Sequence, residues 1–464
     1  MLQLHDTATR SLAPLVASKE GYVGIYVCGP TVYAPPHIGH GRFTLVYDIL
    51  RRYLESTGVQ VRHVSNVTDI DDKIINVANS EDRTSASVAL EFEAAWWDAM
   101  DGIGVLKPTV IPHATDYVDQ MVAMIAELVG REVAYETSDG VYLEVAKVEG
   151  YGLLAQQSLD SLRSGARVDV IEEKRAPYDF ALWKKAKPGE PEWESPFGGG
   201  RPGWHTECVV MALALLGEGF SLHGAGTDLK FPHNENERAQ AVALGRPFAR
   251  HWMHHGMLTQ NGDKMSKSIG NVVSLSELLA EHDHRAYRFV VLQAHYRADM
   301  EMSATGLEAA GRALKGLDAL ERRLAEASVS LSASASASAS ASGADAVAGA
   351  ELTARFRAHM DDDLSTPEAL ADVFDGLRSA NSALDRGDTA LGLAVGRAAI
   401  DCFGALGLFP KAAAQVSDDA LDLARRRDAA RAARDWAAAD RLRDEIVAKG
   451  YRVEDTPNGT RVLL

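Results

Sequence analysis

The hydrophobic positions near the start of the chain predict a strand, a helix and a second strand. Apolar, β-prone runs span residues 22–28 and 59–64. Between them, apolar side chains recur at helical spacing over residues 39–57, namely Phe43, Val46, Tyr47, Leu50 and Tyr53. This opening is typical of a parallel sheet that binds nucleotides at the carboxyl ends of its strands, where Cys28 and His37 fall.

The middle of the chain alternates helical and β-prone patterns. Helices are predicted over residues 85–100 and 115–130, a hairpin over 133–148, and strands over 220–223 and 250–257. Asp139-Gly140 supplies the turn of the hairpin. From the hairpin to about Arg201 the chain is rich in proline, glycine and charge. We interpret this stretch as an insertion that divides a nucleotide-binding fold into two halves.

Beyond Ser303 the pattern becomes helical and is dominated by alanine and leucine. Residues 328–342 alternate alanine and serine, which can bury almost nothing, so a flexible linker is predicted there. Helical periodicity resumes over residues 352–408. The chain then changes to an arginine-rich helical pair and a hairpin over residues 451–464, turned at residues 457–459.

Length and composition limit the possible classes of protein. With 464 residues, 46% of them hydrophobic, the chain can build a large core in two to four domains. The first twenty residues lack the apolar stretch of a secretory signal, and the longest apolar run, residues 208–216, is too short to span a membrane. The three cysteines, Cys28, Cys208 and Cys402, are odd in number and widely spaced. They argue against a disulfide framework and for a reduced, cytoplasmic setting.

The net charge of −17 disfavours indiscriminate binding to phosphate backbones. The C-terminal segment nevertheless carries seven arginines between residues 425 and 443. Arg427, Arg431 and Arg434 are predicted to share one helical face. Aspartates are interleaved with them, so the pattern leaves open both an RNA contact and a solvated amphipathic helix.

Two short motifs carry chemistry suited to a nucleoside triphosphate. His37-Ile38-Gly39-His40 opens the predicted helix, where free N–H groups and the helix dipole favour phosphate oxygens. Lys264-Met265-Ser266-Lys267-Ser268 lies between glycines and is predicted to be a basic loop that closes on the same phosphates. Either motif alone is more often a capped or solvated segment. Their occurrence together favours a phosphate site.

This pair of motifs resembles the HIGH and KMSKS signatures of class I aminoacyl-tRNA synthetases, and the surrounding sequence resembles the cysteinyl-tRNA synthetases. The resemblance implies activation of L-cysteine with ATP to cysteinyl-adenylate and pyrophosphate, then transfer of cysteine to the 3'-terminal ribose of tRNA(Cys). His37, His40, Lys264 and Lys267 would be catalytic. Besides His37, His40 and Lys267, the ATP-binding residues would be Gly39, Asp228 and Ser268, with Mg²⁺ accompanying ATP.

The resemblance also implies an α/β fold: a Rossmann-like parallel-sheet catalytic core with a connective insertion, followed by an α-helical bundle and a small C-terminal α/β module. The expected boundaries are 1–115 for the first half of the core, 116–203 for the insertion, 204–302 for the second half with the basic loop, 303–410 for a tRNA-binding bundle, and 411–464 for a module that contacts the anticodon.

The residue pattern alone gives only a weak indication of a metal site. His233 and Glu237 would face the same way if residues 234–244 are helical, and Cys28 and Cys208 are competent zinc ligands. Buried cysteines are more often plain apolar packing. The resemblance implies that these four residues bind one Zn²⁺ ion. Asn234 departs from the family, where a second histidine usually follows the zinc ligand, and this puts a neighbouring substrate contact in doubt rather than the metal.

The resemblance assigns Gly29, Thr68 and Trp204 to substrate binding, with Trp204 as the aromatic wall of the cysteine pocket. A zinc ion that binds the substrate sulfur would distinguish cysteine from serine without an editing domain. A monomer without membrane contact is expected. One alternative is the cysteine–amino sugar ligase of mycothiol biosynthesis, which shares this fold. Another is a noncatalytic RNA- or zinc-binding relative.

Overall fold

A computed structural model describes residues 1–18, 20–157, 173–260, 263–264, 273–334, 343–411, 417–456 and 459–463. Its centre is a four-stranded parallel sheet in the order β10-β9-β3-β4. The strands are β3 (Val23–Val27), β4 (Val61–Ser65), β9 (Leu222–Gly226) and β10 (Trp252–His255). Because β9 and β10 follow the predicted insertion yet pair beside β3, the expectation of one sheet built from two halves of the chain is confirmed.

Helices cover the sheet, as buried parallel strands require. All residues of β3, β9 and β10 are buried. The surrounding helices are α1 (Ile38–Ser56), α2 (Asp72–Ser80), α3 (Ser85–Gly102), α4 (Val118–Gly130), α6 (Trp204–Leu216) and α7 (Glu235–Ala243). The predicted helices over residues 39–57, 85–100 and 115–130 are therefore confirmed, with small shifts at their ends, and α7 meets the condition that residues 234–244 be helical.

A second sheet lies in the predicted insertion. It is antiparallel, in the order β5-β6-β7-β8, with β5 (Ala134–Glu136), β6 (Gly140–Leu143), β7 (Phe180–Lys185) and β8 (Gly200–Pro202). β5 and β6 form the predicted hairpin. Smaller pairs are β1 (Gln3–Asp6) with β2 (Ser11–Pro14), and the set β12-β11-β13 of Asp263–Lys264, Leu258–Gln260 and Met300–Glu301.

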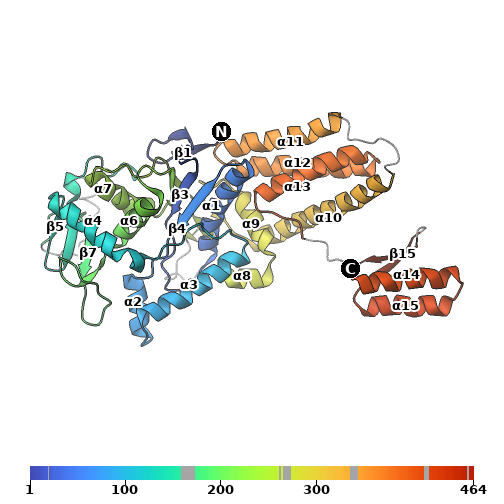
Figure 1. Ribbon diagram of the computed structural model, residues 1–464, viewed down its shortest axis with the longest axis horizontal. Coiled ribbons are helices and arrows are strands. Elements are labelled where there is room, and N and C mark those ends of the chain that lie inside the picture. The colour runs from blue at the N-terminus through green and yellow to red at the C-terminus, as the bar shows by residue number, and fades with distance from the viewer. Residues whose placement is uncertain are drawn as a thin grey trace.

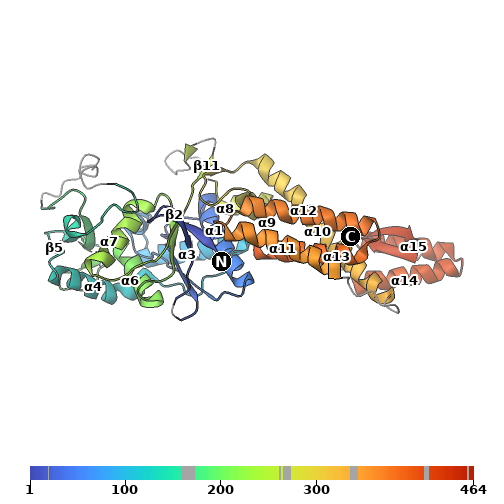
Figure 2. The ribbon, with the colours of Figure 1, turned by 90° about the horizontal axis from the view of Figure 1, so that it is seen from above.

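The C-terminal half is helical until its last segment. After α8 (Leu275–Glu281) and α9 (His284–Leu292) come four bundle helices: α10 (Ala304–Ser334), α11 (Gly343–Asp361), α12 (Thr366–Asp385) and α13 (Thr389–Ala405). A terminal module follows, with α14 (Asp418–Ala432), α15 (Trp436–Ala448) and the hairpin of β14 (Arg452–Thr456) and β15 (Gly459–Leu463). Figures 1 and 2 show the insertion and this module at opposite ends of the long axis, with the core and bundle between them.

Two predictions about the C-terminal half need correction. The linker predicted over residues 328–342 begins too early, because α10 continues to Ser334; alanine favours a helix even where little is buried. Residues 335–342 lie outside the described residues. Arg434 does not share a helical face with Arg427 and Arg431, because α14 ends at Ala432 and Arg434 has a φ of 59°.

A single hydrophobic cluster joins the core to the bundle. It contains Ile25 and Leu50 from the core together with Leu317 and Phe403 from the bundle, all fully buried. The terminal module has a cluster of its own, formed by Ala420, Leu423, Ala424, Ile446 and Val462. Within the described ranges, no helix combines the length and apolarity that crossing a membrane requires. The domain boundaries predicted from the sequence stay predictions.

Candidate active site and metal cluster

A pocket of about 320 Å³ opens at the carboxyl ends of β3 and β9. The residues singled out from the sequence that line it are Cys28, Gly29, His37, Gly39, His40, Trp204 and Asp228. They come from segments nearly 200 residues apart in the chain, which the parallel pairing of β3 with β9 brings together. This is the edge of a parallel sheet at which ligands are expected to bind.

The two histidines are held at the N-terminus of α1. His37 is the N-cap residue, and its Nδ1 accepts a hydrogen bond from the Gly39 N–H at 3.1 Å. Nδ1 of His40 accepts from the His37 N–H at 3.2 Å, and the two rings stack with centroids 3.7 Å apart. Because both Nδ1 atoms are acceptors, the neutral rings carry their proton on Nε2. The rings therefore present N–H donors, beside the positive end of a 19-residue helix dipole.

The segments on both sides of the basic motif lie against this helix start. The Ile38 N–H donates to the Val273 carbonyl at 3.1 Å, and the Leu275 N–H donates to the Pro36 carbonyl at 3.2 Å. On the other side, the backbone of Lys264 pairs with Thr259 in β11. Lys267 and Ser268 lie outside the described residues, as does the side chain of Lys264, so their predicted contacts stay predictions.

Four buried side chains form a cluster at the inner end of the pocket. They are Cys28 directly after β3, Cys208 on α6, His233 just before α7, and Glu237 on α7, and their ligand atoms all lie within 4.8 Å of one another. Cys208 Sγ is 3.6 Å from His233 Nε2, Cys28 Sγ is 3.4 Å from Glu237 Oε1, and His233 Nε2 is 2.9 Å from Glu237 Oε1. Donor atoms around a tetrahedral zinc ion lie about 3.5 Å apart, so the set fits a metal of this size and softness.

Neighbouring side chains fix the orientation of these four. Nδ1 of His233 makes a 2.9 Å hydrogen bond with Nδ1 of His205, which turns Nε2 of His233 toward the cluster. The second carboxylate oxygen of Glu237 bonds Nε2 of His223 at 2.6 Å. Such partners behind the ligands are typical of metal sites in proteins. A hydrogen bond from the Cys28 thiol lowers the pKa of Cys208, whereas burial raises the pKa of Cys28 well above its usual range.

Similarity to known proteins decides the family. The model of the class I (C) tRNA synthetase catalytic domain matches residues 14–312, and that of the DALR domain matches residues 355–409. The chain is 42% identical to a cysteine–tRNA ligase of Thermus thermophilus over an alignment of 484 residues, covering 99% of this chain and 98% of that one. It is 43% identical over 473 residues to the cysteine–tRNA ligase of Alkalilimnicola ehrlichii, covering 99% of both chains. The chain belongs to the cysteine–tRNA ligase family of class I aminoacyl-tRNA synthetases.

Solved structures agree with the fold expected of a cysteine–tRNA ligase. Methionyl-tRNA synthetase of Mycobacterium tuberculosis in complex with methionyl-adenylate superposes with a TM-score of 0.61 at 16% identity, over 83% of this chain and 90% of that one. At this identity the likeness concerns the fold alone. The matches to the cysteine–tRNA ligases run through the terminal module, which favours a tRNA ligase over the amino sugar ligase kept as an alternative.

Thr68 and Asn234 make buried contacts that the sequence does not reveal, and the assignment of Thr68 to substrate binding stays a prediction. Thr68 does not line the pocket; it is buried, and its hydroxyl donates to Glu207 Oε2 at 2.9 Å, because that buried carboxylate needs a donor. Asn234 lies behind the cluster rather than beside the substrate space. Its amide nitrogen donates to Glu237 Oε1 at 2.9 Å and to Cys28 Sγ at 3.5 Å.

The sequence-based interpretation of the ligase missed several pocket residues. Lys73 lies over the ring of Tyr33 at 5.2 Å, and Trp96 contacts the edge of His40 at 5.3 Å; all four line the pocket. Trp96 lies within a predicted helix, where an aromatic residue is typical of ordinary core packing. Lys73 follows three aspartates at residues 69, 71 and 72, so this short charged run was a signal that could have been found.

Proposed function

We propose that this chain charges tRNA(Cys) with cysteine, by activating L-cysteine with ATP to cysteinyl-adenylate and pyrophosphate and then transferring cysteine to the 3'-terminal ribose. One observation carries the proposal beyond family membership. Cys28 is a member of the four-residue cluster and also lines the pocket whose other wall carries His37 and His40. A place for a thiol and a place for phosphates therefore share one cavity.

Cys28, Cys208, His233 and Glu237 would hold Zn²⁺. When bound, zinc supplies a soft Lewis-acidic centre that favours a thiolate over the hydroxyl of serine. Trp204 closes this side of the pocket, with its ring 4.0 Å from that of His233. Gly29 lets the chain pass close to its neighbour, because a side chain there would overlap the Asn66 carbonyl oxygen. The amino acid would thus be oriented by its sulfur.

The N-terminal turn of α1 would bind the triphosphate. The carboxylate of cysteine attacks the α-phosphorus, the bond to the bridging oxygen breaks, and pyrophosphate leaves; Mg²⁺ bound with ATP would offset part of the phosphate charge. His37 and His40 donate to the phosphate oxygens as negative charge builds on them, and Lys264, Lys267 and Ser268 would add to this stabilisation. Asp228, which lines the same pocket, would accept a hydrogen bond from the ribose of ATP. Positioning and electrostatics carry this step.

The second step requires tRNA. A hydroxyl of its terminal ribose attacks the carbonyl carbon of the adenylate, and AMP leaves. The DALR match over residues 355–409 supports tRNA binding by the bundle. In the terminal module, Arg427 and Arg431 both pair with Asp455 and so act as framework, whereas Arg426, Arg441 and Arg443 are exposed and suit anticodon phosphates. We propose that the enzyme acts as a monomer in the cytoplasm.

Aminoacylation of total tRNA tests the proposal. Purified full-length protein with ATP, Mg²⁺ and Zn²⁺ should attach labelled cysteine to one tRNA species and should reject labelled serine. Equal activation of serine and cysteine by the zinc-loaded protein would remove the metal from specificity. Pyrophosphate exchange with cysteine but no charged tRNA would instead point to a small-molecule acceptor such as an amino sugar.

A further inference from the structure

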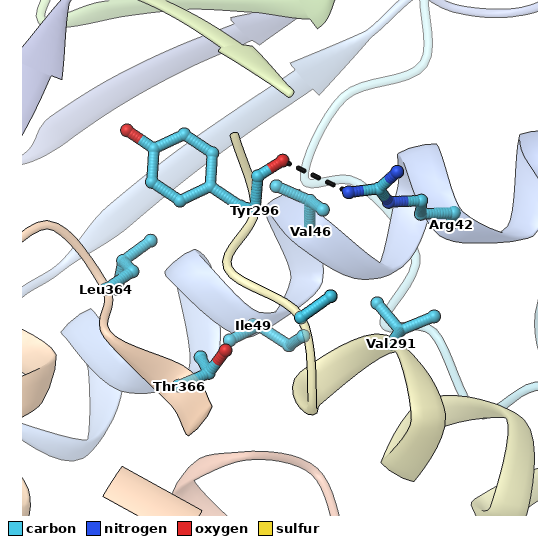
Figure 3. A pocket seen from close by; sticks show the side chains of 8 residues that line it. Arg42, Val46, Ile49, Val291, Tyr296, Leu364 and Thr366 are labelled. Atoms are coloured by element: carbon cyan, nitrogen blue, oxygen red, sulfur yellow. Dashed lines mark hydrogen bonds between the residues drawn. The ribbon is translucent and has the colours of Figure 1, made fainter. Parts of the chain in front are cut away.

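Arg42 is a buried cation held by backbone carbonyls. It lies on α1, two residues after His40, is 1% exposed, and lines the active-site pocket. Its Nη1 donates to the Met257 carbonyl at 2.5 Å, and its Nη2 donates to the Tyr296 carbonyl at 3.3 Å and also to the Ala298 carbonyl. Figure 3 shows the guanidinium directed at Tyr296. Among the described residues, no carboxylate forms an ion pair with it.

The three carbonyls belong to the two segments that enter the strand pair β11–β13. Met257 directly precedes β11, while Tyr296 and Ala298 lie in the connection from α9 to β13. The Met257 carbonyl also accepts from the Met300 N–H at 3.0 Å, and the Tyr296 carbonyl accepts from the Gly256 N–H at 2.9 Å. Arg42 therefore uses the second lone pair of carbonyls that already join these two segments.

This junction bears on the position of the basic motif. β11 pairs in parallel with β13 and antiparallel with β12, whose last residue is Lys264. Arg42 also lines a cavity of only about 10 Å³ between α1, α9 and the start of α12, which is too small to hold a water molecule with room to spare. Arg42 therefore connects α1, the helix that carries the two histidines, to the segments flanking β11, the strand that leads to Lys264.

Packing alone does not call for a cation here. Removing a guanidinium from water is costly, and its carbonyl acceptors compensate only in part, whereas an apolar side chain would fill the same space without that penalty. The neighbours Val46 and Ile49 on the same face of α1 show that the surroundings accept apolar groups (Figure 3). The charge is therefore best explained by what its directional donors hold in place.

We propose that Arg42 is a positioning residue for cysteine activation, fixing the β11–β13 pair, and with it the backbone of Lys264, relative to His37 and His40. The inference rests on the proposed function, because it concerns the same reaction. It assigns Arg42 to the nucleotide side of the pocket. Loss of Arg42 should then impair the chemical step with ATP while leaving the cysteine subsite, which is built from other elements, unchanged.

Pyrophosphate exchange by full-length Arg42→Lys and Arg42→Met proteins tests this role. We expect kcat to fall about 100-fold in Arg42→Met, the scale of a misplacement near 1 Å, with KM for cysteine changed less than about twofold. Lysine keeps the charge, but its compact ammonium cannot span carbonyls on two segments, so an intermediate loss is expected.

Arg288→Lys is the matched control. Arg288 is 2% exposed and likewise donates to backbone carbonyls, those of Ile103, Gly104 and Leu406, but it pairs with Asp48 and does not line the pocket. Its replacement should lower the melting temperature as much as that of Arg42 while leaving kcat for exchange within about threefold at a temperature where both are folded.

The outcomes separate the two proposals. Absence of cysteine-dependent exchange in the wild-type protein would contradict the proposed function rather than the role of Arg42. Retained kcat in Arg42→Lys and Arg42→Met, a parallel rise in KM for cysteine, or an equal loss in Arg288→Lys would each reduce Arg42 to a structural residue. If Arg42→Met does not fold, as judged by circular dichroism, the kcat of Arg42→Lys decides.

Discussion

Replacing Asn234 with leucine should weaken the metal site without removing a ligand. The Asn234 side chain is fully buried, donates to Glu237 Oε1 at 2.9 Å and Cys28 Sγ at 3.5 Å, and pairs through its oxygen with His254 Nε2 at 2.9 Å. Leucine has a similar volume but can make none of these bonds. The substitution therefore removes the hydrogen bonds that orient two predicted ligands, Glu237 and Cys28, and leaves all four ligands present.

The size of the effect follows from the two bonds to ligand atoms. A hydrogen bond to a charged group contributes about 1.5 kcal/mol at the low end, so the pair amounts to about 3 kcal/mol. A bound ion would itself hold Glu237 and Cys28 in part, so we expect a smaller cost. Zinc affinity should fall about 10- to 100-fold, equivalent to about 1.4–2.7 kcal/mol.

Competition with a chromophoric chelator measures this affinity directly in apo protein titrated with Zn²⁺. The matched control is Asn236→Leu. Asn236 has the same side chain, lies on the adjoining α7, is 2% exposed, and accepts a 2.6 Å hydrogen bond from Tyr151 rather than contacting a ligand. The Asn236→Leu protein should have a lower free energy of unfolding but the same zinc affinity as the wild type. Wild-type affinity in Asn234→Leu, or an equal loss in both variants, would refute the reasoning.

Three further predictions concern single side chains. Gly29→Ala should abolish cysteine-dependent pyrophosphate exchange, because a methyl group would overlap the Asn66 carbonyl oxygen, whereas Gly130→Ala, with open space around it, should retain exchange. Trp204→Ala should raise KM for cysteine about tenfold with unchanged zinc content, since it removes the pocket wall but no ligand; an unchanged KM would place the ring outside the subsite. Burial opposes ionisation of Asp48, but its two arginine partners outweigh burial and lower its pKa in the folded protein. The ionised carboxylate therefore stabilises the fold above about pH 4, and this contribution is lost as the pH falls through the lower folded-state pKa. Asp48→Asn should therefore cost about 3 kcal/mol in urea unfolding at pH 7 and less at pH 3; an equal cost at both values would show that the carboxylate charge is not the source.

The nucleotide-binding half was predictable because its signals are local. Apolar, β-prone runs and helical spacing predict β3, β4 and α1, and the histidine motif lies at the helix start, as predicted. The end of α10 could not be predicted in the same way. A run of alanine and serine has moderate helix propensity but buries as little apolar surface as a linker does. Local composition cannot distinguish a helix from a linker where tertiary contacts determine which of the two forms.

The site is harder to predict from the sequence, because its residues come together only through the order of strands in the sheet. The spacing of Cys28, Cys208 and His233 does not place their side chains together; the adjacency of β3 and β9 does, and from the sequence only the family resemblance indicates this set. The sequence gives only a weak indication of the role of Arg42. It occupies the face of α1 that carries Val46 and Ile49, and a charge on an apolar face is the kind of local inconsistency that marks functional positions (Figure 3).

The shared apolar cluster that joins the sheet to the bundle has a consequence for unfolding. Since Ile25 and Leu50 are buried in one continuous cluster with Leu317 and Phe403, neither part can open without exposing the other, and the two should lose structure in one cooperative transition. The terminal module is a separate unit with only its own small cluster. We expect it to unfold locally while the pocket stays intact, so activation of cysteine should persist under conditions in which the proposed anticodon contact is lost.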